Sequence, residues 1–465
     1  MYKKITLRRG NCMDIIMDIN GIVNSFVWGP PMLLLIVGTG LYLSVRTGFF
    51  SLRKLGYVLK NTLLKMFDKE QVGEGEVTAF QAVATALSAT VGTGNIAGVA
   101  TAIALGGPGA IFWMWLAAIF GMTTKFAEVV LAVKFREKTD DGRFVGGPMY
   151  YIEKGLGWKW LAVLFALFGV LASFGIGNMT QSNSIGTALN TSFSINPIMS
   201  GIIVAIATGL VIVGGLKRIG AFTEKLVPFM AAIYILGGIV LIIKNAGQLP
   251  AAFSLIFQNA FTGTAAAGGF AGATIANAMK FGIARGVFTN EAGLGSAPIA
   301  HAAATTDHPV RQGLWGVFEV FADTIVIASI TALAIITTGV WETGLTGTEL
   351  TSAAFDATYA GGHYVVTISL VLFAYSTILG WEYYGERCLE YLFGTKPIIV
   401  YRLLWCGLII VGAIGGLELI WDIADTLNGM MAIPNLIGVA LLSGTVFKLT
   451  KEYFTKEKLI KKETD

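Results

Sequence analysis

Long apolar runs, separated by short polar stretches, recur along the whole of this 465-residue chain. A helix needs about 20 apolar residues to cross the hydrocarbon core of a bilayer. Only 13% of the residues are charged, against roughly 25% in soluble domains. We therefore predict an all-α integral membrane protein with about eleven transmembrane helices. The predicted spans cover residues 25–45, 78–104, 109–133, 161–189, 198–216, 226–243, 268–299, 313–338, 364–386, 398–416 and 428–448.

Lysine and arginine gather in alternate loops. They lie between spans 1 and 2, 3 and 4, 5 and 6, 7 and 8, and 9 and 10, and in the tail after span 11, whereas the other inter-span loops hold only Lys244. By the positive-inside rule this predicts a multi-pass protein of the cell membrane, with its N-terminus outside and its C-terminus in the cytoplasm. Lys3, Lys4, Arg8 and Arg9 oppose this orientation, and translation starting at Met13 or Met17 would remove them.

No part of the chain is long enough for a separate soluble domain, so residues 1–465 are expected to form one membrane domain. The stretch 250–262 is too short to span and is expected to be a connecting helix. The predicted segments are an N-terminal tail (1–24), a leading helix and cytoplasmic loop (25–77), a first repeat (78–243), a connecting segment (244–267), a second repeat (268–448) and a cytoplasmic tail (449–465).

Cysteine and histidine give no sign of a disulfide framework or of a metal centre. The three cysteines have no paired spacing, and the three histidines are expected to be solvated or to cap helices. No organic cofactor, nucleic-acid partner or obligate protein partner is expected. The residues concerned are Cys12, Cys388, Cys406, His301, His308 and His363.

Two of the predicted spans contain glycine-rich interruptions. Span 2 holds Gly92, Gly94 and Gly98 within seven residues, and span 7 is interrupted at 281–286, ahead of a second glycine-rich stretch at 290–298. Each interior glycine costs about 0.8–1.0 kcal/mol relative to alanine. The interruptions lie five spans apart, and a five-span repeat must run upside down in its second copy, as in secondary transporters.

These features have other interpretations. A single glycine-rich run usually serves close helix packing, but two in corresponding positions favour broken helices. The spacing at 92–98 departs from a dinucleotide-binding fingerprint. A channel would need a filter motif and an intramembrane enzyme would need a nucleophile or a metal pair, and the sequence shows neither. A carrier, rather than an enzyme, is therefore expected.

The run from Gly106 to Gly121, GGPGAIFWMWLAAIFG, resembles the signature of the alanine or glycine:cation symporter family, also called sodium:alanine symporters. The stretches 94–98, 285–298 and 381–386 resemble the same family, and the likeness extends along nearly the whole chain. The resemblance implies a fold like that of the leucine transporter within the amino acid-polyamine-organocation superfamily. One leading helix would precede five plus five helices in inverted repeat, with spans 2 and 7 broken.

The resemblance also implies binding residues. The amino acid would be held by groups in spans 2 and 7, together with Gln181 and Trp381 as a hydrogen-bonding partner and a cap. A sodium ion would be held by carbonyl and hydroxyl oxygens, which hard cations prefer. The implied substrate residues are Thr93, Gly94, Asn95, Gln181, Gly282, Ile283, Thr377 and Trp381, and the implied sodium ligands are Ser88, Val91, Phe373, Ser376 and Thr377.

Some assignments stay open at this point. Gln181 and Trp381 are as consistent with interhelical packing as with substrate contact. Glu128, Glu319 and Asp323 fall inside spans, where an acid is a functional candidate by default. However, Glu128 could simply pair with Lys125, and Asp323 could bond to a neighbouring helix.

The predicted function is sodium-coupled symport of alanine or another small neutral amino acid, such as glycine or serine, by alternating access. The alternative is a proton-coupled or glutamine-preferring carrier of the same fold. The partners are thus a small amino acid, sodium and the lipid bilayer.

Overall fold

The computed structural model describes residues 12–66, 72–262, 275–415 and 418–464. Nearly all of the described chain is helical. The first half contains α1 (Cys12–Val27), α2 (Pro30–Arg46), α3 (Phe50–Arg53), α4 (Leu55–Asn61), α5 (Ala79–Thr90), α6 (Val99–Gly106), α7 (Ala110–Lys134), a hairpin of β1 (Glu137–Lys138) and β2 (Phe144–Val145), α8 (Pro148–Leu156), α9 (Lys159–Ala172), α10 (Thr180–Phe193) and α11 (Pro197–Ile212).

The second half continues with longer helices and with the loops that join them. Its helices are α12 (Gly215–Lys244), α13 (Leu249–Phe261), α14 (Ile275–Asn290), α15 (Pro298–His301), α16 (Pro309–Val320), α17 (Ser329–Thr338), α18 (Gly347–Thr358), α19 (Gly362–Phe393), α20 (Ile398–Ile414) and α21 (Glu418–Thr464). Wider π-helical turns at Gly94–Gly98, Ser173–Met179 and Phe321–Ala328 lead into α6, α10 and α17, and 3-10 turns occur at Leu63–Lys65, Ala246–Gln248 and Val340–Thr343.

Seven helices within the described ranges are long and apolar enough to cross a membrane. The pair Ala79–Thr90 and Gly94–Gly106 passes the same test together and is bent by 49°, which gives up to eight. The apolar helices α11 and α20 are shorter than this criterion requires. The chain is therefore a multi-pass, mainly helical membrane protein, and the count of eleven spans stays a prediction.

Several predicted boundaries differ from the structure. The first span begins earlier than residue 25, because α1 starts at Cys12 and an apolar stretch runs from Ile16 to Arg46. The predicted cytoplasmic tail after residue 448 is the continuation of α21 to Thr464. The connecting helix expected at 250–262 corresponds to α13. Residues 1–11 and 263–274, which include the four basic residues before the first span and the start of the predicted span 7, lie outside the described residues.

The predicted interruption at 281–286 is wrong. Helix α14 is continuous from Ile275 to Asn290, and the irregular stretch follows it at 291–297, before the short α15. Glycine is tolerated in this helix because Gly282 packs tightly on α7: a Cβ there would lie 2.2 Å from the Ala110 carbonyl oxygen. Close helix packing therefore explains the first glycine-rich stretch of this span.

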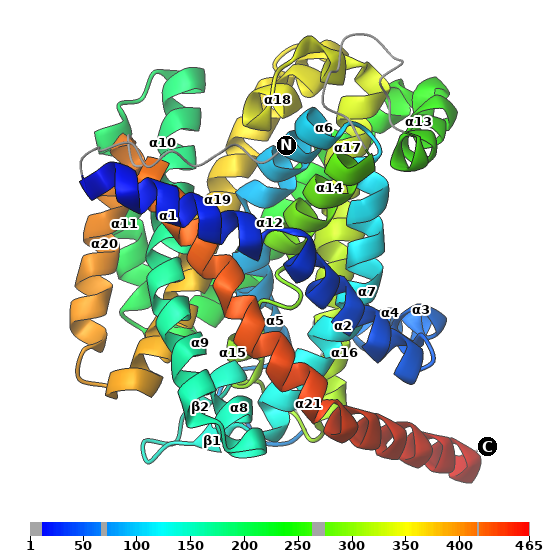
Figure 1. Ribbon diagram of the computed structural model, residues 1–465, viewed down its shortest axis with the longest axis vertical. Coiled ribbons are helices and arrows are strands. Elements are labelled where there is room, and N and C mark those ends of the chain that lie inside the picture. The colour runs from blue at the N-terminus through cyan, green and yellow to red at the C-terminus, as the bar shows by residue number, and fades with distance from the viewer. Residues whose placement is uncertain (1–11, 67–71, 263–274, 416–417, 465) are drawn as a thin grey trace.

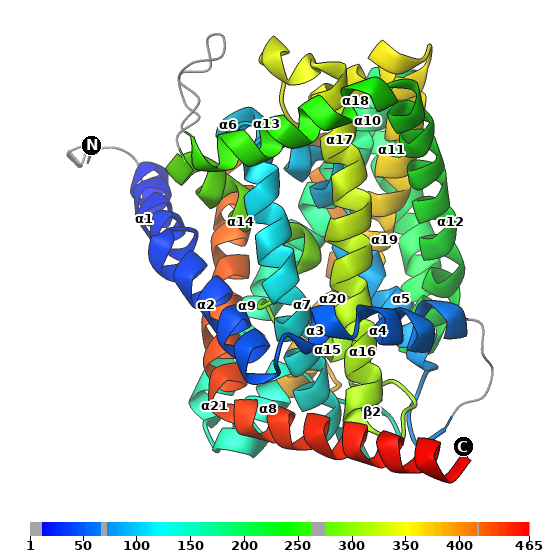
Figure 2. The ribbon, with the colours of Figure 1, turned by 90° about the vertical axis from the view of Figure 1, so that its right-hand side faces the viewer.

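The long helices run roughly parallel, and short ones lie across their ends (Figure 1, Figure 2). Figure 2 shows α13 across the upper end, and shows α3, α4 and the final part of α21 across the lower end. Near the middle, α5 ends and α14 gives way to irregular chain. These two interruptions border the pocket described next.

Candidate substrate and cation site

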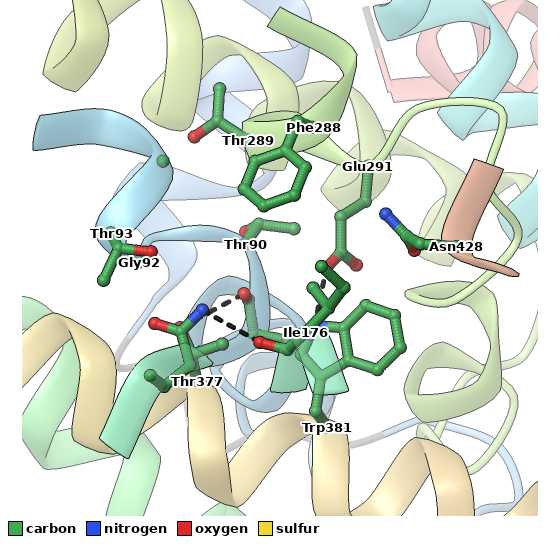
Figure 3. Close-up of a pocket in the computed structure, with 13 residues that line it drawn as sticks. Thr90, Gly92, Thr93, Ile176, Phe288, Thr289, Glu291, Thr377, Trp381 and Asn428 are labelled. Atoms are coloured by element: carbon green, nitrogen blue, oxygen red, sulfur yellow. Dashed lines mark hydrogen bonds between the residues drawn. The ribbon is translucent and has the colours of Figure 1, made fainter. Parts of the chain in front are cut away.

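A central pocket lies between the ends of α5 and α14 and the long helices α19 and α21 (Figure 3). The space within it is narrow, with room for about one water molecule. Its lining is Ala89, Thr90, Gly92, Thr93, Gly94, Ile176, Gln181, Phe288, Thr289, Glu291, Thr377, Trp381 and Asn428.

The first wall of the pocket is the break between α5 and the Gly94–Gly98 turn. Helix α5 begins with a capping box of Thr78 and Gln81 and ends at Thr90, after which the chain bends. A Cβ on Gly92 would lie 2.6 Å from Thr377 Oγ1, so glycine permits the close approach of α19 there. The first N–H groups of the next helical segment have no partner within it and point positive charge toward the break.

The second wall follows α14, where Glu291 adopts a left-handed conformation with φ of 54°. Its side chain is 3% exposed. Its Oε1 accepts a hydrogen bond of 2.8 Å from Trp381 Nε1, and its Oε2 accepts one from Ser296 Oγ. Figure 3 shows Glu291 and Trp381 pointing toward each other across the pocket. A carboxylate is thereby fixed at the edge of the cavity.

Two amide side chains add hydrogen-bond acceptors to this lining. Gln181 on α10 is buried, and its Nε2 donates to the Ile176 carbonyl at 3.0 Å. In the described part of the chain, Gln181 Oε1 and Asn428 Oδ1 are both buried without a hydrogen-bond partner. Buried polar atoms are usually paired, so these acceptors indicate a ligand that brings N–H donors.

A cluster of neutral oxygens lies where α19 crosses the end of α5. Ser376 Oγ is 3.1 Å from the Ser88 carbonyl oxygen and 2.8 Å from that of Phe373. Thr377 Oγ1 is 3.0 Å from the Phe373 carbonyl oxygen and 3.3 Å from that of Ala89. All of these residues are buried. Oxygens of this kind are suitable ligands for a hard cation.

Five of the eight predicted substrate residues line the pocket: Thr93, Gly94, Gln181, Thr377 and Trp381. The other three do not. Asn95 lies behind the break, where its Oδ1 accepts from Gly92 N at 3.0 Å and its Nδ2 donates to Asp323 Oδ1 at 2.7 Å. Gly282 packs on α7, and Ile283 belongs to an apolar cluster with residues of α2.

Of the five predicted sodium ligands, four are brought together by the hydrogen bonds above. Val91 is the fifth, and it is buried directly after the last residue of α5. Thr377 bonds to the carbonyl of Ala89, which the sequence interpretation did not include. Thr377 thus borders both the pocket and the oxygen cluster.

Sequence reasoning missed several lining residues, chiefly Glu291, Asn428, Thr289 and Phe288. Glu291 had a usable signal, because it is an acid in a glycine-rich stretch of a predicted span. Asn428 gave none, since a lone asparagine in an apolar helix is common. Its position depends on how α21 packs.

The buried acids outside the pocket are also held by specific contacts. Lys125 Nζ pairs with Glu319 Oε1 at 3.1 Å, whereas Asp323 bonds to the neighbouring Asn95. His301 is fully buried and lies 3.1 Å from Glu319, so the expectation of a solvated or capping role is wrong for this histidine. His308 does cap a helix, since its Nδ1 accepts from Val310 N at the start of α16.

Sequence comparisons match this chain to known carriers. The model of the sodium:alanine symporter family matches residues 13–465. The sodium/alanine symporter AgcS of Methanococcus maripaludis is 53% identical over 449 residues, covering 95% of this chain and 98% of that protein. A protein of Bacillus subtilis named "Probable sodium/glutamine symporter GlnT" is 40% identical, covering 96% of this chain and 92% of its own length.

The fold is also shared with a solved structure. The crystal structure of MhsT in complex with L-phenylalanine aligns with a TM-score of 0.56 at 16% identity, over 77% of this chain and 89% of that one. At this identity the likeness concerns the fold alone. It supports the expected resemblance to the leucine-transporter fold.

Proposed function

Because the chain belongs to the sodium:alanine symporter family, we propose that it carries alanine, or another small neutral amino acid such as glycine or serine, into the cell together with sodium. The observation that carries this proposal is the central pocket between the bend after α5 and the irregular chain after α14. Each part of a zwitterionic amino acid finds a complementary group there.

The ammonium group of the substrate would bind on the acceptor side of the pocket. Asn428 Oδ1 and the Glu291 carboxylate provide oxygen atoms for its N–H donors there. Gln181 Oε1 provides a further acceptor nearer the break, 3.8 Å from the position of a Cβ on Gly92. The carboxylate would bind at the other side, on the N–H groups of Thr93 and Gly94 at the start of the second helical segment. The two charged ends of the substrate thereby fix its orientation.

The size of the pocket favours a small side chain. Trp381 is almost fully buried and borders the cavity, where it is held by Glu291. The cavity has room for about one water molecule, so even alanine requires some opening of the walls. A longer side chain requires more, and this favours alanine, glycine or serine over glutamine, which a relative's name mentions.

Sodium would bind at the oxygen cluster of Ser88, Phe373, Ser376 and Thr377, with Val91 nearby. Because the Ser88 and Ala89 carbonyls belong to the last turn of α5, and the Phe373 carbonyl and both hydroxyls belong to α19, a cation there would hold this helix end against α19. Thr377 reaches both sites, so occupation of one site would stabilise the other. Reciprocal linkage of this kind is what symport requires.

The proposed orientation places the N-terminus outside and the C-terminus in the cytoplasm. Helix α1 and the end of α21 lie at opposite ends of the long axis (Figure 2), as an odd number of crossings requires. The basic residues of α3, α4 and the end of α21 lie at the same end, which would be the cytoplasmic one.

Alanine binding to the purified protein, measured by calorimetry in sodium and in potassium solutions, tests the proposal. We expect tight binding in sodium and much weaker binding in potassium. We further expect glycine and serine to compete with alanine, and glutamine and leucine to compete poorly. Equal alanine affinity in both salts, or stronger competition by leucine than by glycine, would contradict the assignment.

A further inference from the structure

A second group of buried polar side chains lies beside the amino-acid and sodium sites, and one of its members, Glu291, also borders the amino-acid pocket. Its members come from α7, α15, α16 and the turn after it, and the irregular stretch after α14, and none is more than 3% exposed. Burying an unpaired charge in a membrane protein costs several kcal/mol. Each buried acid must therefore be paired with a cation, held by hydrogen-bond donors or protonated. The ionisable members are Lys125, Glu128, Glu291, His301, Glu319 and Asp323.

The partners of Glu319 are those of an ionised carboxylate, because both of its oxygens are paired. Lys125 Nζ lies 3.1 Å from one of its oxygens and His301 Nε2 lies 3.1 Å from the other. Gln312 Nε2 lies 2.8 Å from His301 Nδ1. An amide nitrogen only donates, so Nδ1 accepts and Nε2 carries the hydrogen that is donated to Glu319. The single lysine of the group is therefore committed to Glu319.

Two of the remaining acids have their own partners. Asp323 accepts hydrogen bonds from Asn95 Nδ2, Thr289 Oγ1 and Thr324 Oγ1. Glu291 accepts from Trp381 and Ser296 and borders the pocket where we place the substrate ammonium. Donors or a ligand cation thus stabilise both carboxylates.

Glu128 differs from these acids because only one of its oxygens is used. Its Oε1 accepts from Gly293 N at 3.1 Å and from Asn435 Nδ2. Its Oε2 is buried without a hydrogen-bond partner among the described residues. The ionisable groups that face it are Lys125 from α7, Glu319 from α16, and Tyr151 from α8, whose hydroxyl donates to Asn435 Oδ1.

We propose that Glu128 is a proton-binding site. The neutral acid keeps Oε1 as the carbonyl oxygen that accepts the two N–H groups, and the proton forms an O–H bond at Oε2. Hydronium supplies that proton and leaves water behind. A carboxylate at this position would instead bury a negative charge whose nearest cation already pairs with Glu319. Protonation of Glu128 therefore leaves less uncompensated charge than a carboxylate would.

The proton would be linked to the substrate pocket through the backbone. Gly293 lies two residues after Glu291, and Asn435 Nδ2 also donates to the Gly293 carbonyl at 2.8 Å. Glu128 and Asn435 therefore hold the irregular stretch that presents Glu291 to the pocket. Deprotonation of Glu128 would disturb this stretch, so alanine affinity should fall as the pH rises. This part rests on the proposed function, whereas proton binding itself does not.

Infrared spectroscopy tests proton binding independently of transport. We expect the purified protein at neutral pH to show the carbonyl stretch of a protonated carboxyl group. Glu128→Gln should remove this band, because glutamine has the same shape but no carboxyl group. Glu137→Gln, which changes an exposed acid paired with Lys154, should retain it. Absence of the band from the wild type, or its persistence in Glu128→Gln, would overturn the proposal.

Alanine titrations over a range of pH test the link to the pocket. We expect wild-type affinity to decrease over the pH range in which the infrared band disappears, and the affinity of Glu128→Gln to be independent of pH there. Glu137→Gln should follow the wild-type profile. If Glu128→Gln does not fold, the wild type alone tests the link. Its infrared band and its alanine affinity must then decrease over the same pH range. Identical pH profiles for wild type and Glu128→Gln, or separate titrations in the wild type, would contradict the link.

Discussion

Ser376→Ala is expected to weaken sodium binding without changing the substrate site. When sodium is bound, the Ser376 hydroxyl would provide one oxygen ligand, and an interaction with a charged group contributes about 1.5–3 kcal/mol. Before sodium binds, the same hydroxyl donates to carbonyls at 2.8 and 3.1 Å, which contributes about 0.5–1.5 kcal/mol that the variant also loses. The net loss is about 1–1.5 kcal/mol, or roughly 5- to 12-fold in sodium affinity.

The assay is an alanine titration by calorimetry at several sodium concentrations. Because sodium and alanine binding are reciprocally linked, the variant should bind alanine weakly at low sodium and recover at high sodium. Ser369→Ala is the matched control, since Ser369 is a buried serine on the same helix whose Oγ has no hydrogen-bond partner in the described chain. An alanine defect that persists at saturating sodium would refute Ser376 as a pure ion ligand, and an equal sodium defect in Ser369→Ala would refute the location of the site.

Two further substitutions test the pocket wall and the helix packing. Trp381→Ala should enlarge the cavity, so that glutamine and leucine inhibit labelled alanine uptake more strongly than in the wild type; unchanged selectivity would assign Trp381 to packing alone. Gly282→Ala should lower the free energy of unfolding by about 1–3 kcal/mol, because its Cβ would lie 2.2 Å from the Ala110 carbonyl oxygen. Gly98→Ala, with no atom within 4 Å of the new Cβ, should not destabilise the protein, and equal melting temperatures for the two variants would contradict the packing argument.

The sequence predicted those features that depend on local patterns. Apolar length located most of the long helices, and the glycines at 92–98 marked the bend that follows α5. The family resemblance then placed Gln181, Thr377 and Trp381, which do line one pocket. Each of these inferences needs only the residue types along one stretch of chain, or a motif that the chain shares with the family.

The rest depends on tertiary contacts that one sequence does not encode locally. Glycines at 282 and 286 look like a helix break, but their role is close packing on α7, and the chain leaves the helix only after Asn290. Asn95 looks like a pocket residue, yet it turns away because Asp323 on another element provides its partner. The burial of His301 likewise follows from the position of Glu319 and Gln312.

Sodium-driven accumulation of alanine in proteoliposomes tests the central claim most directly. Vesicles are loaded with potassium and labelled alanine. They are then diluted into a sodium medium that contains labelled alanine at the same concentration. The proposed mechanism predicts that internal alanine rises above the external concentration while the sodium gradient lasts, and that it does not rise when choline replaces sodium. Equal uptake in choline, or uptake that stops at equal concentrations with the sodium gradient intact, would contradict sodium-coupled symport.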